Sequence, residues 1–137
     1  MYSNNRGKSW SLIDTYPGYY DPNNGRIEGP IVMGNTVYIA VYERGVFRSA
    51  DRGKTWESVS DGLPQGHSWE LFAVGKALIA VEGEAGIFQL KHDRTWVFVK
   101  PYPPDSINAM DVLDTTLYAA TGEQGVYRID LTESSGD

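Results

Sequence analysis

The chain has 137 residues, no cysteine and a net charge of −6 at pH 7, with an isoelectric point of about 4.8. The lack of cysteine excludes disulfides, thiolate metal sites and a cysteine nucleophile, and the acidic balance argues against a nucleic-acid backbone as a partner. The sequence has no apolar run of about 18 residues and no secretory leader at its polar start, so we expect no membrane partner and leave the compartment open.

Segments rich in β-branched and aromatic residues alternate with turns, and the 15 glycines and 7 prolines suit many turns, so an all-β chain is predicted. The expected strands are, in chain order, residues 9–14, 28–33, 36–42, 45–49, 55–59, 70–74, 77–81, 86–90, 95–99, 107–113, 116–121 and 125–129. A loop over 15–26, dense in turn formers and tyrosines, separates the first strand from the rest.

A short motif that begins with glycine recurs three times, as Gly45-Val46-Phe47-Arg48, Gly86-Ile87-Phe88-Gln89 and Gly125-Val126-Tyr127-Arg128. The glycines are 41 and 39 residues apart, and a period near 40 is typical of propeller blades or solenoid repeats. We therefore expect a single unit over 1–137. Its expected parts are an outer strand in 1–14, one blade in 27–60, a second in 69–100, three strands of a third in 106–131 and a tail in 132–137.

The stretch from Ser49 to Trp56 reads Ser-Ala-Asp-Arg-Gly-Lys-Thr-Trp and predicts a hairpin turn between two strands. Asp51 can accept backbone N–H groups across the turn, and Gly53 can take the positive φ that other residues resist. Ser49 and Thr55 can add hydroxyl bonds to the same backbone. Trp56 is a large apolar side chain that can pin the turn to a core.

Two variants of this stretch lie one repeat away on either side. The first covers residues 3–10, and the third, shorter and without the glycine, covers residues 91–96. We expect the matching positions to have a structural role. They are Ser3, Asn5, Gly7, Trp10, Ser49, Asp51, Gly53, Thr55, Trp56, Asp93, Thr95 and Trp96.

The pattern S-x-D-x-G-x-T-W resembles the Asp-box of the BNR repeat family, which includes sialidases, photosystem assembly factors and many uncharacterised β-propellers. The resemblance covers nearly the whole chain at the level of the repeat, and it implies a β-propeller of four-stranded antiparallel blades. In that family the box is structural and lies between the third and fourth strands of a blade. The resemblance therefore bears on the fold and not on an activity.

Three blades are too few for a closed ring, because propellers typically have about four to eight. An open arc would leave apolar blade faces in water and its end strands unpaired. We therefore expect a homodimer in which two arcs make a six-bladed ring, and residues 9–14 of each chain complete the last blade of the other. A fragment of a longer propeller, a larger ring and an open arc are the alternatives.

In a propeller, the loops between blades share one face with the turns between second and third strands, and the box turns lie on the other face. This placement gathers the candidate ligand-binding residues, which are Tyr16, Tyr19, Tyr20, Asp21, Arg26, Glu43, Arg44, Trp69, Glu84, Tyr102 and Glu123. An acidic face rimmed by aromatic rings suits a sugar, a cation or a basic peptide. Glu43, Glu84 and Glu123 also fit a simpler interpretation, since glutamate suits a solvated turn before glycine.

We expect a non-catalytic binding or scaffold module that takes a carbohydrate, a protein or a peptide and needs no cofactor. His67 and His92 have no second ligand near them in the sequence, so no metal site is expected. The alternative is a glycoside hydrolase-like enzyme of the sialidase-type propeller class. Such an enzyme would need two carboxylates across one sugar and, as the resemblance implies, an arginine cluster, whereas only Arg26 and Arg44 are expected on the ligand face.

Overall fold

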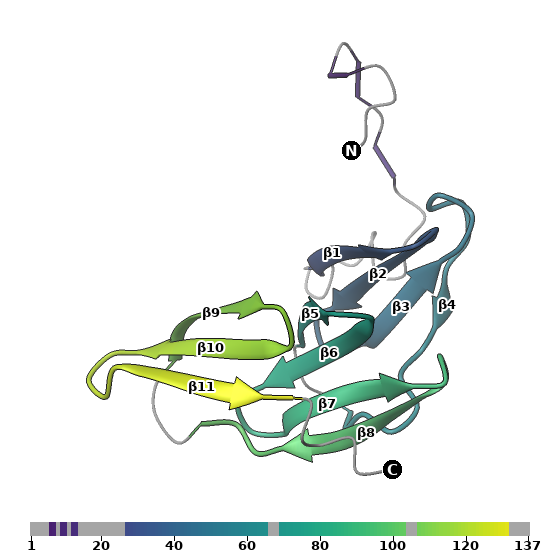
Figure 1. Ribbon diagram of the computed structural model, residues 1–137. Coiled ribbons are helices and arrows are strands. Elements are labelled where there is room, and N and C mark those ends of the chain that lie inside the picture. The colour runs from purple at the N-terminus through teal and green to yellow at the C-terminus, as the bar shows by residue number, and fades with distance from the viewer. Residues whose placement is uncertain are drawn as a thin grey trace.

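The computed structural model describes residues 6–7, 9–10, 12–13, 27–65, 69–103 and 107–131. These residues form eleven strands and no helix, and the strands make three separate antiparallel sheets (Figure 1). Within these ranges no helix has the length and apolar character needed to span a membrane. The expectation of an all-β chain is confirmed.

Each sheet is built from consecutive strands joined by short turns. The first contains β1 (Ile27–Met33), β2 (Thr36–Val41), β3 (Gly45–Ser49) and β4 (Glu57–Ser58). The second contains β5 (Glu70–Val74), β6 (Ala77–Glu82), β7 (Gly86–Lys91) and β8 (Thr95–Lys100). The third contains β9 (Ile107–Leu113), β10 (Thr116–Thr121) and β11 (Val126–Asp130). From residue 27 onward, the expected strand ends lie within about two residues of these.

The strand expected over residues 9–14 is not formed by the described residues 9–10 and 12–13, which belong to none of the three sheets. A strand needs a neighbouring strand to take up its backbone N–H and C=O groups, and this segment instead lies beside the turn between β3 and β4. A Cβ atom built on Gly53 would lie 3.0 Å from Cδ1 of Ile13. Trp10 and Leu12 are 60% and 57% exposed, so the segment presents apolar side chains to solvent.

The inner strand β6 of the second sheet contributes to two cores, because successive side chains of a strand point to opposite faces. Leu78 and Ala80 of β6 belong to a core shared with the first sheet, which includes Tyr38 of β2. Ile79 and Val81 of β6 belong to a second core shared with β10 and β11 of the third sheet. All four β6 side chains are buried, so the second sheet is covered on both faces.

Neighbouring sheets also meet through their first strands. β1 contacts β5, and β5 contacts β9. Figure 1 shows the three sheets side by side, with the first strand of each near its neighbour and the last strand of each toward the outside. The arrangement creates one inner edge, formed by β1, β5 and β9, where side chains from different sheets come together.

The turn between β3 and β4 is held by side chains. The hydroxyl of Ser49, a residue only 1% exposed, accepts the N–H of Gly53 at 2.8 Å and donates to Oδ1 of Asp51 at 2.8 Å. Asp51 also accepts the N–H of Thr55 at 2.9 Å and the hydroxyl of Thr55. These bonds, with the Thr55 hydroxyl as the largest cause, lower the pKa of Asp51 to about 2. The expected bonds to the turn backbone are confirmed for Ser49 and Asp51, whereas the Thr55 hydroxyl bonds the Asp51 carboxylate and not the backbone.

The backbone of this turn has two consecutive left-handed residues, Arg52 and Gly53, with φ of 62° and 88°. The same pair of left-handed residues recurs at 6–7 and at 92–93. Counted back from the Thr-Trp dipeptide that follows, Asp93 takes the position of Gly53 and Lys91 takes that of Asp51. The expected equivalence of Asp93 and Asp51 is therefore wrong, because the third stretch lacks two residues that would bring Asp93 into register.

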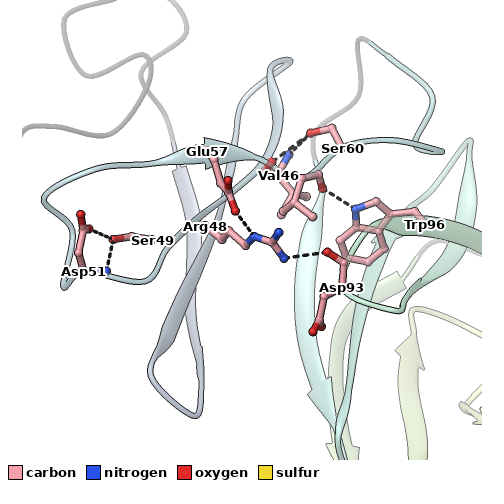
Figure 2. Close-up of polar contacts among 9 residues, drawn as sticks. Val46, Arg48, Ser49, Asp51, Glu57, Ser60, Asp93 and Trp96 are labelled. Atoms are coloured by element: carbon pink, nitrogen blue, oxygen red, sulfur yellow. Dashed lines mark hydrogen bonds and ion pairs between the residues drawn. The ribbon is translucent and has the colours of Figure 1, made fainter.

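The second sheet is attached to the end of the first through Trp96, which is 2% exposed. Its indole Nε1–H donates to the carbonyl of Val59 at 2.6 Å, in a contact between β8 and the chain that leaves β4. Arg48 on β3 joins the same two sheets, because its Nε pairs with Glu57 at 2.6 Å and its Nη1 donates to the carbonyl of Asp93 at 2.8 Å (Figure 2). The first two sheets are thus hydrogen-bonded to each other as well as packed.

The glycines that begin β3 and β7 leave room for the chain at the end of the outer strand. A Cβ on Gly45 would lie 2.5 Å from Oγ of Ser60, and one on Gly86 would lie 3.0 Å from the carbonyl oxygen of Lys100. In the third sheet, a Cβ on Gly125 would meet no described atom within 4 Å. Within the described residues, β11 is the outer edge of its sheet.

Replacement of Asp51 by asparagine is expected to reduce the loss of stability at acid pH. The carboxylate has a pKa of about 2 in the fold against an ordinary 3.8, so its stabilising effect is present above about pH 4 and is lost as the pH falls through about 2. Urea unfolding across that range should show a shallower pH dependence for Asp51→Asn than for the wild type. Asp114→Asn removes an exposed carboxylate from the β9–β10 turn and should keep the wild-type slope; equal slopes for all three proteins would contradict this role.

Candidate functional site

A cavity of about 360 Å³ lies between the first and second sheets. Three carboxylates and three aromatic rings line it, from Glu28, Tyr42, Trp69, Glu70, Glu82 and Tyr102. Ala40, Val81 and Gly83 complete the lining, so the cavity has no lysine, arginine or histidine among the described residues that form it. A concave site with acidic and aromatic walls is suited to bind a positively charged group.

Two of the carboxylates occupy the same position of the repeat. Glu28 of β1 pairs across the sheet with Ala40, and Glu70 of β5 pairs with Val81. The second strands of the two sheets begin at Thr36 and Ala77, and each partner residue lies four residues after that start. Because β1 and β5 contact each other at the inner edge, the repeat brings these two carboxylates to the same cavity. The equivalent residue of β9, opposite Ala120, is Ala109.

Burial and neighbouring negative charges disfavour the ionised forms of two acidic groups in the cavity, Glu70 and Tyr102. Burial and, second, the negative charge of Glu28 raise the pKa of Glu70. Burial and the negative charges of Glu70 and Glu82 raise the pKa of Tyr102. A like charge and a drier environment both disfavour an ionised acid, so these shifts show that the carboxylates act on one another and on the tyrosine. A cation in the cavity would relieve this repulsion.

Packing and hydrogen bonds hold the walls in place. Trp69 is 2% exposed and meets Phe88 edge to face, with ring centroids 5.4 Å apart and an interplanar angle of 88°. Tyr102 lies beside the β6–β7 turn, where a Cβ on Gly83 would be 3.8 Å from its Cε1. Oε1 of Glu82 accepts the N–H of Glu84 at 2.7 Å, which orients the Glu82 carboxylate at the end of β6. The site is built on strand ends and a short turn rather than on one long loop.

The residues expected at the ligand face lie in different parts of the molecule. Trp69 and Tyr102 line the cavity. Glu43 and Arg44 line a separate hollow of about 580 Å³ beside the β2–β3 turn. Glu84 and Glu123 are exposed on turns and line neither of these hollows. The remaining expected positions lie outside the described residues: Tyr16, Tyr19, Tyr20, Asp21 and Arg26 of the ligand set, and Ser3 and Asn5 of the first box.

Four of the six acidic and aromatic lining residues were not expected from the sequence, namely Glu28, Tyr42, Glu70 and Glu82. A signal for two of them was available, since Glu28 and Glu70 lie near the start of the first strand of consecutive repeats. The expected turn glutamates follow the second strand, whereas the cavity opens where first strands meet. Comparisons with protein-family models, with curated proteins and with solved structures found no match to this chain.

Glu70→Gln is expected to stabilise the protein at neutral pH. The neutral amide removes both the desolvation of a charge and its repulsion by Glu28, the two causes of the raised pKa. The gain in the free energy of unfolding should be below about 1 kcal/mol, since half-exposed charges are screened. Because the folded pKa lies above the ordinary 4.5, the difference from the wild type should be present at pH 7 and shrink as the pH falls toward 4.5.

Urea unfolding of both proteins at several pH values measures this difference. Asp114→Asn removes one negative charge outside the cavity and should change the free energy of unfolding by less than about 0.5 kcal/mol. A destabilised Glu70→Gln at neutral pH would show that Glu70 has a favourable structural role instead.

Proposed function

We propose that the chain forms consecutive blades of an Asp-box β-propeller and acts as a non-catalytic binding module whose ligand carries positive charge. The observation that carries the binding proposal is the cavity between the first two sheets, in which three carboxylates and three aromatic rings meet with no basic residue among the described lining. The propeller supplies the geometry, because it brings first strands of neighbouring blades together at one inner edge.

Three features support the propeller. The four-strand antiparallel order occurs twice in succession and is followed by three strands of the same order. Neighbouring sheets meet through their first strands, as blades around an axis do. The side-chain-bonded turn of Ser49 and Asp51 joins β3 to β4, which is the place between third and fourth strands that the Asp-box resemblance implies.

We further propose that two chains close a six-bladed ring, with residues 9–14 of one chain added to β11 of the other. Ile13 lies against Gly53 in the β3–β4 turn of the first sheet. Val59, in the chain that follows β4, likewise contacts Trp96 of β8 in the second sheet. The segment 9–13 therefore stands where the outer strand of a preceding blade would stand. The exposed Trp10 of this segment occupies the repeat position of Trp96. Gly125, just before β11, has open space at the place where Gly45 and Gly86 lie against the chain at the end of an outer strand.

The molar mass in solution tests the ring. Light scattering over a range of concentrations should give a steady value near twice 15.2 kDa. Trp10→Asp should shift the protein toward the monomer, because it places a charge where the ring needs a buried indole, whereas Trp10→Phe should keep the dimer. A wild-type monomer at all concentrations would overturn the closed dimer and leave the cavity proposal intact, since all residues that line the cavity come from one chain.

The cavity favours a cationic ligand over a neutral sugar. Glu28 raises the pKa of Glu70, so a positive group between them gains energy that a neutral hydroxyl group does not. The tyrosine and tryptophan rings add attraction for a cation through their faces. The alternative of a sialidase-like hydrolase finds less support, because its anionic substrate would meet three carboxylates and no arginine of the described lining.

Titration with n-butylammonium chloride and with the neutral isostere n-butanol, followed by amide chemical shifts, tests the binding proposal. The ammonium should perturb the amides of β1, β5 and the β6–β7 turn, and the alcohol should not. Glu28→Gln should weaken the response and Asp114→Asn should leave it unchanged. Equal responses to the amine and the alcohol would contradict cation recognition, and turnover of a fluorogenic glycoside that Glu70→Gln abolishes would contradict the non-catalytic assignment.

A further inference from the structure

The three carboxylates of the cavity come from three different strands, and among the described residues they do not form a group that could hold one metal ion. We infer that the ligand is a linear aliphatic diamine or oligoamine, with one amino group held by Glu28 and Glu70 and a second held by Glu82. This inference rests on the proposed function and specifies the ligand class for the same cavity. Both sheets contribute to the site, because Glu28 comes from the first sheet and the other two carboxylates come from the second.

The first amine position lies where β1 and β5 meet. Glu28 and Glu70 stand at equivalent positions of these two contacting strands, and the charge of Glu28 raises the pKa of Glu70. One ammonium group has three N–H donors and can bond two carboxylates at once. It would also remove the repulsion between them, which a neutral ligand would leave in place.

The second amine position lies at the same end of β6 but on the other face of the sheet, because Glu82 follows Val81, the residue that pairs with Glu70, and successive side chains of a strand point to opposite faces. The Glu82 carboxylate is held by the N–H of Glu84 at 2.7 Å, so it is already oriented before a ligand arrives. Tyr102 connects the two positions, because the charges of both Glu70 and Glu82 raise its pKa. The cavity therefore offers two acidic places that share one aromatic wall.

A single metal ion fits this arrangement less well than an extended dication. Among the residues that the structure describes, no group of three or more acidic, histidine or cysteine side chains is arranged to hold a metal ion, although three carboxylates line the cavity. Three carboxylates that line one cavity without surrounding a single point are best neutralised by a ligand whose positive charges are also separated. A chain of methylenes between two amines supplies that separation.

The aromatic walls suit the methylene part of such a ligand. Tyr42, Trp69 and Tyr102 line the same cavity as the carboxylates, and its volume of about 360 Å³ is small for a ligand pocket. Aromatic rings attract both the apolar chain and the ammonium groups at its ends. A folded sugar ring or a bulky peptide would use the space less well than a slim chain.

Isothermal titration of the full chain with 1-aminobutane, 1,4-diaminobutane and spermidine at low ionic strength tests the ligand class. The diamine should bind about tenfold or more tightly than the monoamine, a difference that corresponds to about 1.4 kcal/mol. The advantage should fall sharply at about 1 M salt, where the Debye length is about 3 Å. A monoamine that binds as tightly as the diamine would overturn this inference while the proposed cation-binding function stands. No binding of any amine would overturn both.

Two variants separate the two amine positions. Glu82→Gln should remove the advantage of the diamine and leave the affinity for 1-aminobutane within about twofold, because the first position is intact. Glu28→Gln should weaken both amines. Asp114→Asn, which causes the same loss of one negative charge in the β9–β10 turn, should keep the wild-type affinities. An equal loss of diamine affinity in Glu82→Gln and Asp114→Asn would show only general attraction to an acidic protein and would overturn the assigned site.

Thermal unfolding of each variant shows whether it is folded, and the glutamine substitutions keep the shape of the side chain they replace. If Glu82→Gln is folded and retains the full diamine advantage, the second amine position is wrong.

Discussion

The structure depends on a sheet that is buried on both faces. Leu78 and Ala80 of β6 pack toward the first sheet, and Ile79 and Val81 pack toward the third. A strand with this pattern cannot leave either face in water without exposing two apolar side chains. The second sheet therefore needs a neighbour on each side, and repetition of one four-strand unit is a direct way to supply both. The inner edge between first strands, and the cavity that lies there, follow from that stacking.

Stacking alone leaves neighbouring sheets free to slide, and the hydrogen bonds between the first two sheets remove that freedom. The buried indole of Trp96 donates to the carbonyl of Val59. If the sheets slipped, a buried donor and a buried acceptor would both lose a partner, which costs about 1–3 kcal/mol for each group left unsatisfied. The turn at Ser49 and Asp51 contributes in the same region, because Arg48, next to it on β3, bonds to the Asp93 carbonyl. The side chains that the sequence marks as a repeated motif thus set the position of one sheet against the next.

Much of the secondary structure could be predicted from the sequence, because glycines at a period near 40 and turn residues between β-branched segments are local signals. Relations between repeats were harder. The strand expected at 9–14 has the correct residue pattern, but whether a strand forms depends on a partner that local sequence does not name. Asp93 was placed by its chemical identity, whereas the turn places residues by count, and two missing residues moved it to the position of Gly53. Glu28 and Glu70 were missed because their proximity arises only when β1 and β5 come together.

The same repeat that stabilises the fold also produces the strain in the cavity. Equivalent positions on β1 and β5 must approach each other, so a glutamate at both positions forces two like charges together, whereas alanine at the equivalent position of β9 does not. A chain selected only for stability would gain by replacing either glutamate. A charge that raises the pKa of a neighbouring acid, as Glu28 does for Glu70, is typical of sites that act on a ligand, and here the proposed ligand that best removes the repulsion is one with more than one positive charge. The energetic cost at Glu70 is thus the physical link between the repeated antiparallel sheet and the proposed recognition of amines.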